Sequence, residues 1–201
     1  MLLFNIKIDG FLERIVIKIG VGLSTFVVLG LILNLSRIPI DWKIILIISL
    51  LGPLYSLLKE KKRLTFTFPK KFKKSTIYSI ILLGLFFFTL YMHTTGAFAY
   101  PWLEDGDPWT HLMGTKYVAL EKTVFEPNPE VDFFFYMDPY PAGYDLLMGV
   151  LHQTSSDIIW TLKFFNALIL ALAILFSFYL FKKITGSGKK AILATFILAM
   201  L

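Results

Sequence analysis

The chain has 201 residues, of which 56% are hydrophobic and only 17% are charged. Ordinary soluble domains are about 45 to 50% apolar and about 25% charged, so this composition indicates an integral membrane protein. The absence of cysteine excludes a disulfide-stapled secreted domain and any thiolate metal site. The net charge of +6 lies in separate runs along the chain, which favours a role in membrane topology over a nucleic-acid-binding surface.

Apolar stretches along the chain predict the membrane-spanning helices. A helix needs about 20 mostly apolar residues to cross a bilayer core about 30 Å thick. Such stretches occupy residues 15–35, 40–58, 76–92 and 158–181, and a fifth begins at residue 191. We therefore expect an all-α polytopic membrane protein with about five transmembrane helices. The fifth is still apolar at Leu201, so we expect it to be truncated, in a fragment or in the product of a truncated gene.

Lysine and arginine residues predict the orientation of these helices, because cytoplasmic loops carry an excess of both. Eight of them lie within residues 59–74, and further lysines flank residues 182–190 and the N-terminal segment. The N-terminus is therefore expected in the cytoplasm of a multi-pass cell-membrane protein, with residues 93–157 outside. Binding of anionic lipids is the alternative reading of these basic runs. Lys163 falls near the outer end of its span, where its stem can reach the interface.

We divide the chain into two parts. Residues 1–75 form a two-helix membrane hairpin with a basic cytoplasmic loop, and residues 76–201 form the start of a membrane core. The external loop 93–157 holds ten of the fourteen acidic residues and many aromatic residues, so we expect it to be folded rather than disordered.

Two interfacial helices are predicted within this loop. Asp107 is a suitable N-cap, Pro108 suits the first helical position, and apolar residues recur at helical spacing up to Leu120. This helix is expected to lie along the outer membrane surface, with Glu121 and Lys122 facing water. A second, shorter helix is expected over residues 144–152.

The acidic residues Glu104, Asp105 and Asp107 are the candidates for chemistry. Mg²⁺ or Mn²⁺ prefers oxygen ligands and is usually bound by one or two carboxylates together with phosphate, and a carboxylate also suits a general base. The alternative is that Asp107 only caps a helix and the other two are solvated. His111 follows Asp107 by one helical turn, so it could reach the same site or could face water.

Two motifs in the loop resemble a known family. Their order and spacing look like the start of the GT-C superfamily of polytopic membrane glycosyltransferases, and more closely the catalytic subunit of archaeal oligosaccharyltransferases. The resemblance covers residues 76–201. The motifs are Asp107-Pro108-Trp109-Thr110-His111 and Tyr140-Pro141-Ala142-Gly143.

The resemblance implies a site and a reaction. Asp107, with Asp105 as second choice, would be catalytic, and both would bind a divalent metal (Mg or Mn) together with Glu104. His111, Trp109 and Tyr140 would bind substrate. The donor would be a sugar or oligosaccharide on a polyprenyl phosphate at the outer membrane face, and the acceptor a protein or a lipid.

Two functions follow as hypotheses. The first is an enzyme: the N-terminal part of a membrane glycosyltransferase that uses a lipid-linked sugar and takes part in protein glycosylation or lipid modification, without nucleic acid as a partner. The alternative is a non-catalytic polytopic membrane protein, such as a transporter half or an assembly subunit, whose outer loop is a folded cap.

Overall fold

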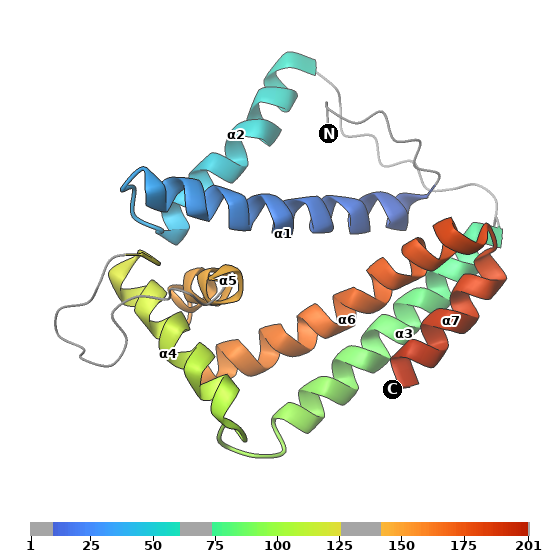
Figure 1. Ribbon diagram of the computed structural model, residues 1–201. Coiled ribbons are helices and arrows are strands. Elements are labelled where there is room, and N and C mark those ends of the chain that lie inside the picture. The colour runs from blue at the N-terminus through green and yellow to red at the C-terminus, as the bar shows by residue number, and fades with distance from the viewer. Residues whose placement is uncertain (1–9, 61–73, 126–141, 201) are drawn as a thin grey trace. The chain divides into compact units, whose positions relative to one another are not determined.

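The structure is a computed structural model that describes residues 10–60, 74–125 and 142–200. Helices make up 83% of these residues, and no strand occurs among them. In chain order (Figure 1) the helices are α1 (Phe11–Leu35), α2 (Trp42–Glu60), α3 (Lys74–Ala97), α4 (Gly106–Glu121), α5 (Gly143–His152), α6 (Ile158–Thr185) and α7 (Gly188–Met200).

Three helices are long and apolar enough to cross a membrane: α1, the segment Thr76–Ala97 of α3, and α6. They confirm three of the predicted spans, so the chain is an all-helical protein with three candidate membrane-spanning helices. The apolar part of α2 is the shorter segment Trp42–Tyr55, and α7 has 13 residues in the described part of the chain. The count of five transmembrane helices therefore stays a prediction.

Helix α2 begins two residues later than the hydropathy pattern predicts. The Ile40 N–H donates to the carbonyl oxygen of Lys122 at 2.7 Å, so Ile40 is bonded outside the helix. The Asp41 carboxylate then accepts the Lys43 N–H at 2.8 Å, which is the usual bond of a helix N-cap. Asp41 therefore caps α2, and the first helical residue is Trp42.

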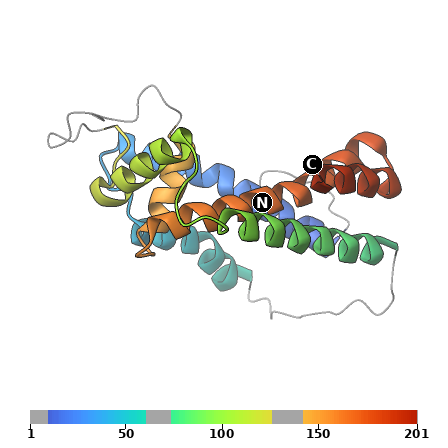
Figure 2. The ribbon, with the colours of Figure 1, turned by 90° about the horizontal axis from the view of Figure 1, so that it is seen from below.

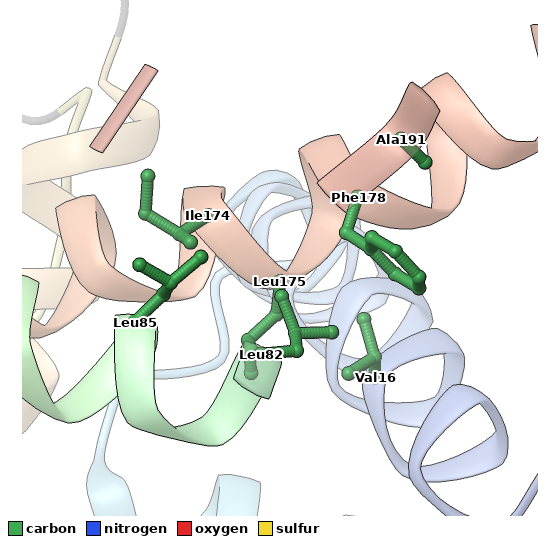
Figure 3. Packing of buried hydrophobic residues seen from close by; sticks show 7 residues of the cluster. All are labelled: Val16, Leu82, Leu85, Ile174, Leu175, Phe178 and Ala191. Carbon is green, nitrogen blue, oxygen red and sulfur yellow. The ribbon is translucent and has the colours of Figure 1, made fainter. Parts of the chain in front are cut away.

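The chain divides into two compact units, and α1 and α6 contribute to both. Unit 1 comprises Met1–Ser24, Pro69–Ala99 and Phe164–Leu201. Its described core joins α1, α3, α6 and α7 through apolar side chains only (Figure 3): Val16, Leu82, Leu85, Ile174, Leu175, Phe178 and Ala191. Close approach depends on small residues. A Cβ on Gly20 would lie 3.0 Å from the Phe176 ring, and one on Gly188 would lie 2.7 Å from the Tyr78 ring.

Unit 2 comprises Thr25–Phe68 and Tyr100–Lys163. Figure 2 shows α5 beside α4, as does Figure 1. A Cβ on Gly149 of α5 would lie 2.6 Å from the Val118 side chain of α4, so this glycine lets the two helices touch. Helix α5 also reaches α1, where Gly30 accommodates Leu146. The buried apolar side chains of this unit are Leu33, Ile40, Ile45, Val118, Val124, Leu146 and Val150.

Candidate functional site

The acidic segment that precedes α4 contains the helix cap, but not at the predicted residue. Asp105 is the N-cap, with an extended backbone (φ −136°, ψ 169°) and a side chain that accepts the Gly106 N–H at 2.7 Å. Asp107 instead lies in the first turn, where the helix dipole stabilises a negative charge. Pro108 is tolerated in the same turn, because the N–H groups there have no partner within the helix. The prediction that Asp107 caps this helix was therefore wrong.

Carboxylates of this segment are exposed at Glu104, Asp105 and Asp107. No three His, Asp or Glu side chains in the described ranges form a group that could hold a metal ion. Mg²⁺ is usually held by one or two carboxylates plus water and phosphate oxygens. Glu104 and Asp107 therefore suit an ion that also binds a substrate phosphate, and they do not by themselves make a closed metal site.

His111 lies one turn beyond Asp107, and its partner is an aspartate from α5. The Nδ1 atom of His111 is 2.8 Å from Oδ1 of Asp145. The Asp145 side chain is 4% exposed and that of His111 is 24% exposed. The sequence reasoning missed Asp145. The available signal was a single acidic residue in the apolar stretch Gly143–His152, where it falls on the buried side of a short helix.

The surroundings of this pair change its electrostatics. Burial raises the pKa of Asp145, and the hydrogen bond from His111 opposes that rise. The neighbouring Tyr144 packs against the His111 ring edge to face, with ring centroids 4.7 Å apart. Burial, together with the charge of Asp145, raises the pKa of Tyr144 to about 12. Tyr144 therefore remains protonated at neutral pH.

The other predicted substrate-binding residues are an aromatic pair. Trp109 is 41% exposed, and its indole N–H donates to the carbonyl oxygen of Leu103 at 3.1 Å, which holds the start of α4 against the preceding loop. The second residue, Tyr140, lies outside the described residues. The structure thus brings His111 to α5 and leaves Trp109 at the surface.

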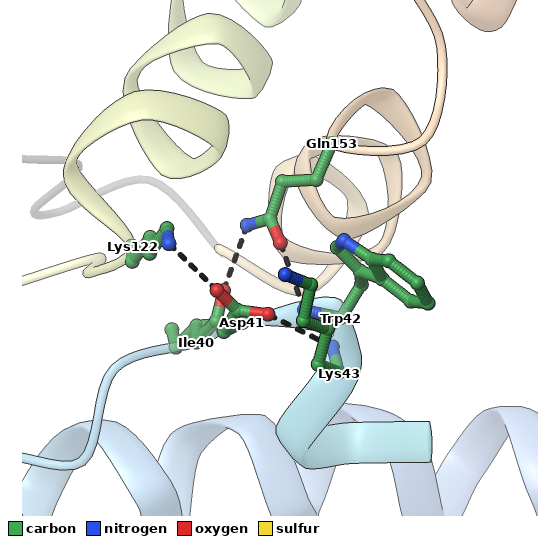
Figure 4. Close-up of polar contacts among 6 residues, drawn as sticks. All are labelled: Ile40, Asp41, Trp42, Lys43, Lys122 and Gln153. Carbon is green, nitrogen blue, oxygen red and sulfur yellow. Dashed lines mark hydrogen bonds and ion pairs between the residues drawn. The ribbon is translucent and has the colours of Figure 1, made fainter.

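A polar cluster links both ends of the outer helix pair to the connection before α2 (Figure 4). Lys122 pairs with Asp41 at 2.6 Å, so the prediction that Lys122 faces water was wrong. Lys122 can make this contact because it ends α4 in the left-handed conformation, at φ 56°. The Gln153 side chain donates to the Ile40 carbonyl and accepts the Trp42 N–H, both at 2.8 Å.

Two further polar side chains of unit 2 are buried and bonded. Asn34, at the end of α1, accepts the Val124 N–H at 2.6 Å and the Thr123 hydroxyl at 3.0 Å. Lys163 is 8% exposed and donates to the Tyr100 carbonyl oxygen at 2.6 Å. The expectation that Lys163 extends to the interface was therefore wrong, because its ammonium group is held by a backbone carbonyl within the protein.

Comparisons of this chain with protein-family models, with curated proteins and with solved structures found no match.

Proposed function

We propose that this chain forms the membrane-embedded start and the acidic outer segment of a GT-C-type glycosyltransferase. The observation that carries the proposal is the position of α4. It begins shortly after α3, a candidate membrane span, and its exposed first turn carries Asp107, with His111 one turn further along. In a lipid-linked sugar donor the phosphate sits at the membrane interface, which is where such a segment would meet it.

The proposed topology has five membrane-crossing helices. Helices α2 and α7 would cross together with α1, α3 and α6, the N-terminus would be cytoplasmic, and α4 and α5 would lie outside. The lysine-rich runs at residues 59–74 and 182–190 support this orientation.

In the proposed reaction, an acceptor atom on a protein or lipid attacks the sugar carbon that carries the phosphate. The bond between that carbon and the phosphate oxygen breaks, and its electron pair leaves with the phosphate. A divalent cation held by Asp107 and Glu104 would offset the charge that develops on the phosphate. The residues of the chain contribute position, by holding a carboxylate on a rigid helix at the depth of the donor head group.

The test uses membranes that contain the protein as expressed from its own gene, supplied with a radiolabelled polyprenyl-phosphate sugar. Label is then counted separately in the protein fraction and the lipid fraction. Asp107→Asn is expected to lower transfer by about 100-fold or more. Because Asp105 caps α4, this substitution leaves the cap intact. The matched control is Glu121→Gln, which changes an exposed carboxylate at the far end of the same helix.

Metal removal is the second arm of this test. Chelation is expected to abolish transfer, and added Mg²⁺ or Mn²⁺ to restore it. Equal rates for Asp107→Asn and wild type would remove Asp107 from the reaction. Absence of transfer by the wild type with every polyprenyl-linked donor would overturn the proposed function.

A second candidate function is a non-catalytic membrane subunit with a folded outer cap. The observation that favours it is the bonding of α4 and α5 to the ends of α1 and α2 through Asn34, Asp41 and Gln153. Bonds of this kind build a rigid cap without requiring a substrate. This function predicts that Asp107→Asn changes neither assembly nor activity of the complex in which the protein works.

A further inference from the structure

The pair formed by His111 and Asp145 is held by tightly packed helices. Its atoms are 2.8 Å apart, and it joins α4 to α5 where Gly149 allows the two helices to touch. A Cβ at Gly149 would approach both the Val118 side chain and, at 3.1 Å, the Thr115 backbone carbonyl. Tyr144 contacts another edge of the imidazole. The ring therefore has little freedom to turn away from the carboxylate.

Packing alone does not explain a carboxylate at this position. Asp145 is 3% exposed and sits among apolar neighbours such as Leu146 and Met148. Apolar side chains of similar volume often replace a buried ionic pair without loss of stability. A buried carboxylate that faces an imidazole does something that an apolar side chain cannot do, because it determines which ring nitrogen carries the proton.

The chemistry of the pair follows from hydrogen-bonding roles. An ionised carboxylate only accepts hydrogen bonds, so His111 must present Nδ1–H to Asp145. The proton of the neutral ring is then on Nδ1, and Nε2 carries the lone pair. This is the arrangement in which a histidine can take a proton from a bound group. The His111 side chain remains 24% exposed, so solvent or a substrate can reach part of the ring.

We propose that Asp145 is a positioning residue that orients His111 as the base for a hydroxyl acceptor. The inference rests on the proposed glycosyl transfer and deepens it by naming the acceptor chemistry. The acceptor O–H bond breaks and its proton moves to Nε2 of His111, while the oxygen bonds the sugar carbon. The bond from that carbon to the phosphate oxygen breaks, and its electron pair leaves on the phosphate. The proton on Nε2 then passes to water.

This assignment separates the two parts of α4. Asp107, in the first turn, is left to the metal and the donor phosphate, and His111, one turn further on, acts on the acceptor. The hydroxyl can belong to a serine or threonine side chain or to a lipid or sugar. Counting label in the protein and lipid fractions separates these two sources.

The first readout is chemical and does not require transfer activity. Diethyl pyrocarbonate modifies unprotonated imidazole, and peptide mapping separates His111 from His93 and His152. A nearby carboxylate stabilises the protonated ring, so Asp145→Asn is expected to move the half-point of His111 modification to lower pH by about one unit. The groups that face His111 from α5 are Asp145 and Tyr144, and Tyr144 stays neutral over this range. An unchanged half-point would show that Asp145 does not control His111 and would overturn the inference.

The second readout is the kinetics of sugar transfer. Asp145→Asn keeps the shape of the side chain and an oxygen that can accept from Nδ1, so a purely structural role predicts an unchanged kcat. A positioning role predicts a loss of about 100- to 10,000-fold in kcat with the donor KM unchanged. Asp145→Glu, which retains a carboxylate, is expected to recover part of that loss.

The outcomes of this experiment are distinguishable. A wild-type protein that transfers sugar while Asp145→Asn matches its kcat would overturn the base assignment and leave the proposed function intact. A wild-type protein that transfers no sugar would overturn the proposed function, and the base role would fall with it. Loss of kcat with recovery in Asp145→Glu, together with the shifted modification profile, would support the inference.

Discussion

Unit 1 and unit 2 are held together in different ways. The described core of unit 1 consists of apolar side chains from α1, α3, α6 and α7. An ion pair at 3.6 Å, between Lys182 and Glu13, lies beside that core. Unit 2 has an apolar core of similar size, but buried polar side chains at Asn34 and Asp145 and the bridging Gln153 also join its helices.

The difference matters because the two units have different alternatives to the packed state. Between membrane-spanning helices, lipid tails are as apolar as leucine, so little hydrophobic driving force selects one packing over another. A buried polar group has no such substitute, because leaving it without its partner costs about 1 to 3 kcal/mol. Directional hydrogen bonds therefore specify how the helices of unit 2 meet, and unit 1 relies on shape.

Truncation of one buried leucine in each unit is the strongest way to break this comparison. Leu146 in α5 and Leu82 in α3 are both fully buried. Leu146→Ala is expected to cost about 2 to 5 kcal/mol, because both a transfer term and a cavity term are lost. Leu82→Ala is expected to cost less, since only packing contacts are lost inside a bilayer. Unfolding midpoints in bicelles measure both, and equal losses would contradict the comparison.

Adding a methyl group to one glycine in each unit is expected to have a smaller effect. A Cβ at Gly149 would lie 2.6 Å from Val118, whereas one at Gly84 in α3 has no described atom within 4 Å. Gly149→Ala should therefore destabilise the protein by about 1 to 3 kcal/mol through overpacking of α4 against α5. Gly84→Ala should be neutral or slightly stabilising, because alanine favours a helix.

The readout for the glycine pair is the rate at which a protease cleaves after Lys116 or Lys122. Loosening of α4 in Gly149→Ala should speed that cleavage, and Gly84→Ala should match the wild type. The reverse order of the two variants would show that α4 and α5 do not depend on close contact at Gly149.

Removal of the charge at Asp41 is expected to have the smallest effect. The ion pair with Lys122 is partly exposed, with side-chain exposures of 42% and 18%, so Asp41→Asn should cost at most about 1 kcal/mol at neutral pH. Asparagine keeps an acceptor for the Lys43 N–H, so this variant removes only the charge.

The pH dependence of that cost has a definite sign. The hydrogen bond from Lys122 lowers the pKa of Asp41 below its ordinary value of 3.8. The stabilisation is therefore complete above 3.8 and is lost as the pH falls through the lowered pKa. The difference in unfolding midpoint between wild type and Asp41→Asn should shrink on acidification. A difference that grows at low pH would exclude the ion pair as its source.

Local features of this chain were predictable from its residues. Runs of apolar residues predicted α1, α3 and α6 as candidate spans, because length and hydropathy decide whether a helix can cross a membrane. The helix expected over residues 144–152 is observed as Gly143–His152. The cap of α4 was misplaced by two residues, because three nearby acidic residues offer competing positions and only the backbone geometry shows that Asp105 is the cap.

The candidate site was only partly predictable. Spacing alone placed Asp107 and His111 on adjacent turns of one helix, and this is confirmed. Asp145 could not be identified, since it comes from another helix and its burial depends on how α5 packs against α4. The same holds for Lys122, whose water-facing position was inferred from helical periodicity, although the chain leaves the helix there.

The sequence by itself determined that the protein is helical, which helices can enter a membrane, and where the acidic residues precede an outer helix. These are properties of short stretches, set by backbone hydrogen bonding and by the transfer of apolar groups. Only the tertiary structure decided the partners of the polar residues. The pairs His111 with Asp145, Asp41 with Lys122, and Ile40 with Gln153 are separated by 34, 81 and 113 positions, and a hydrogen bond forms only when packing brings its two atoms within about 3 Å.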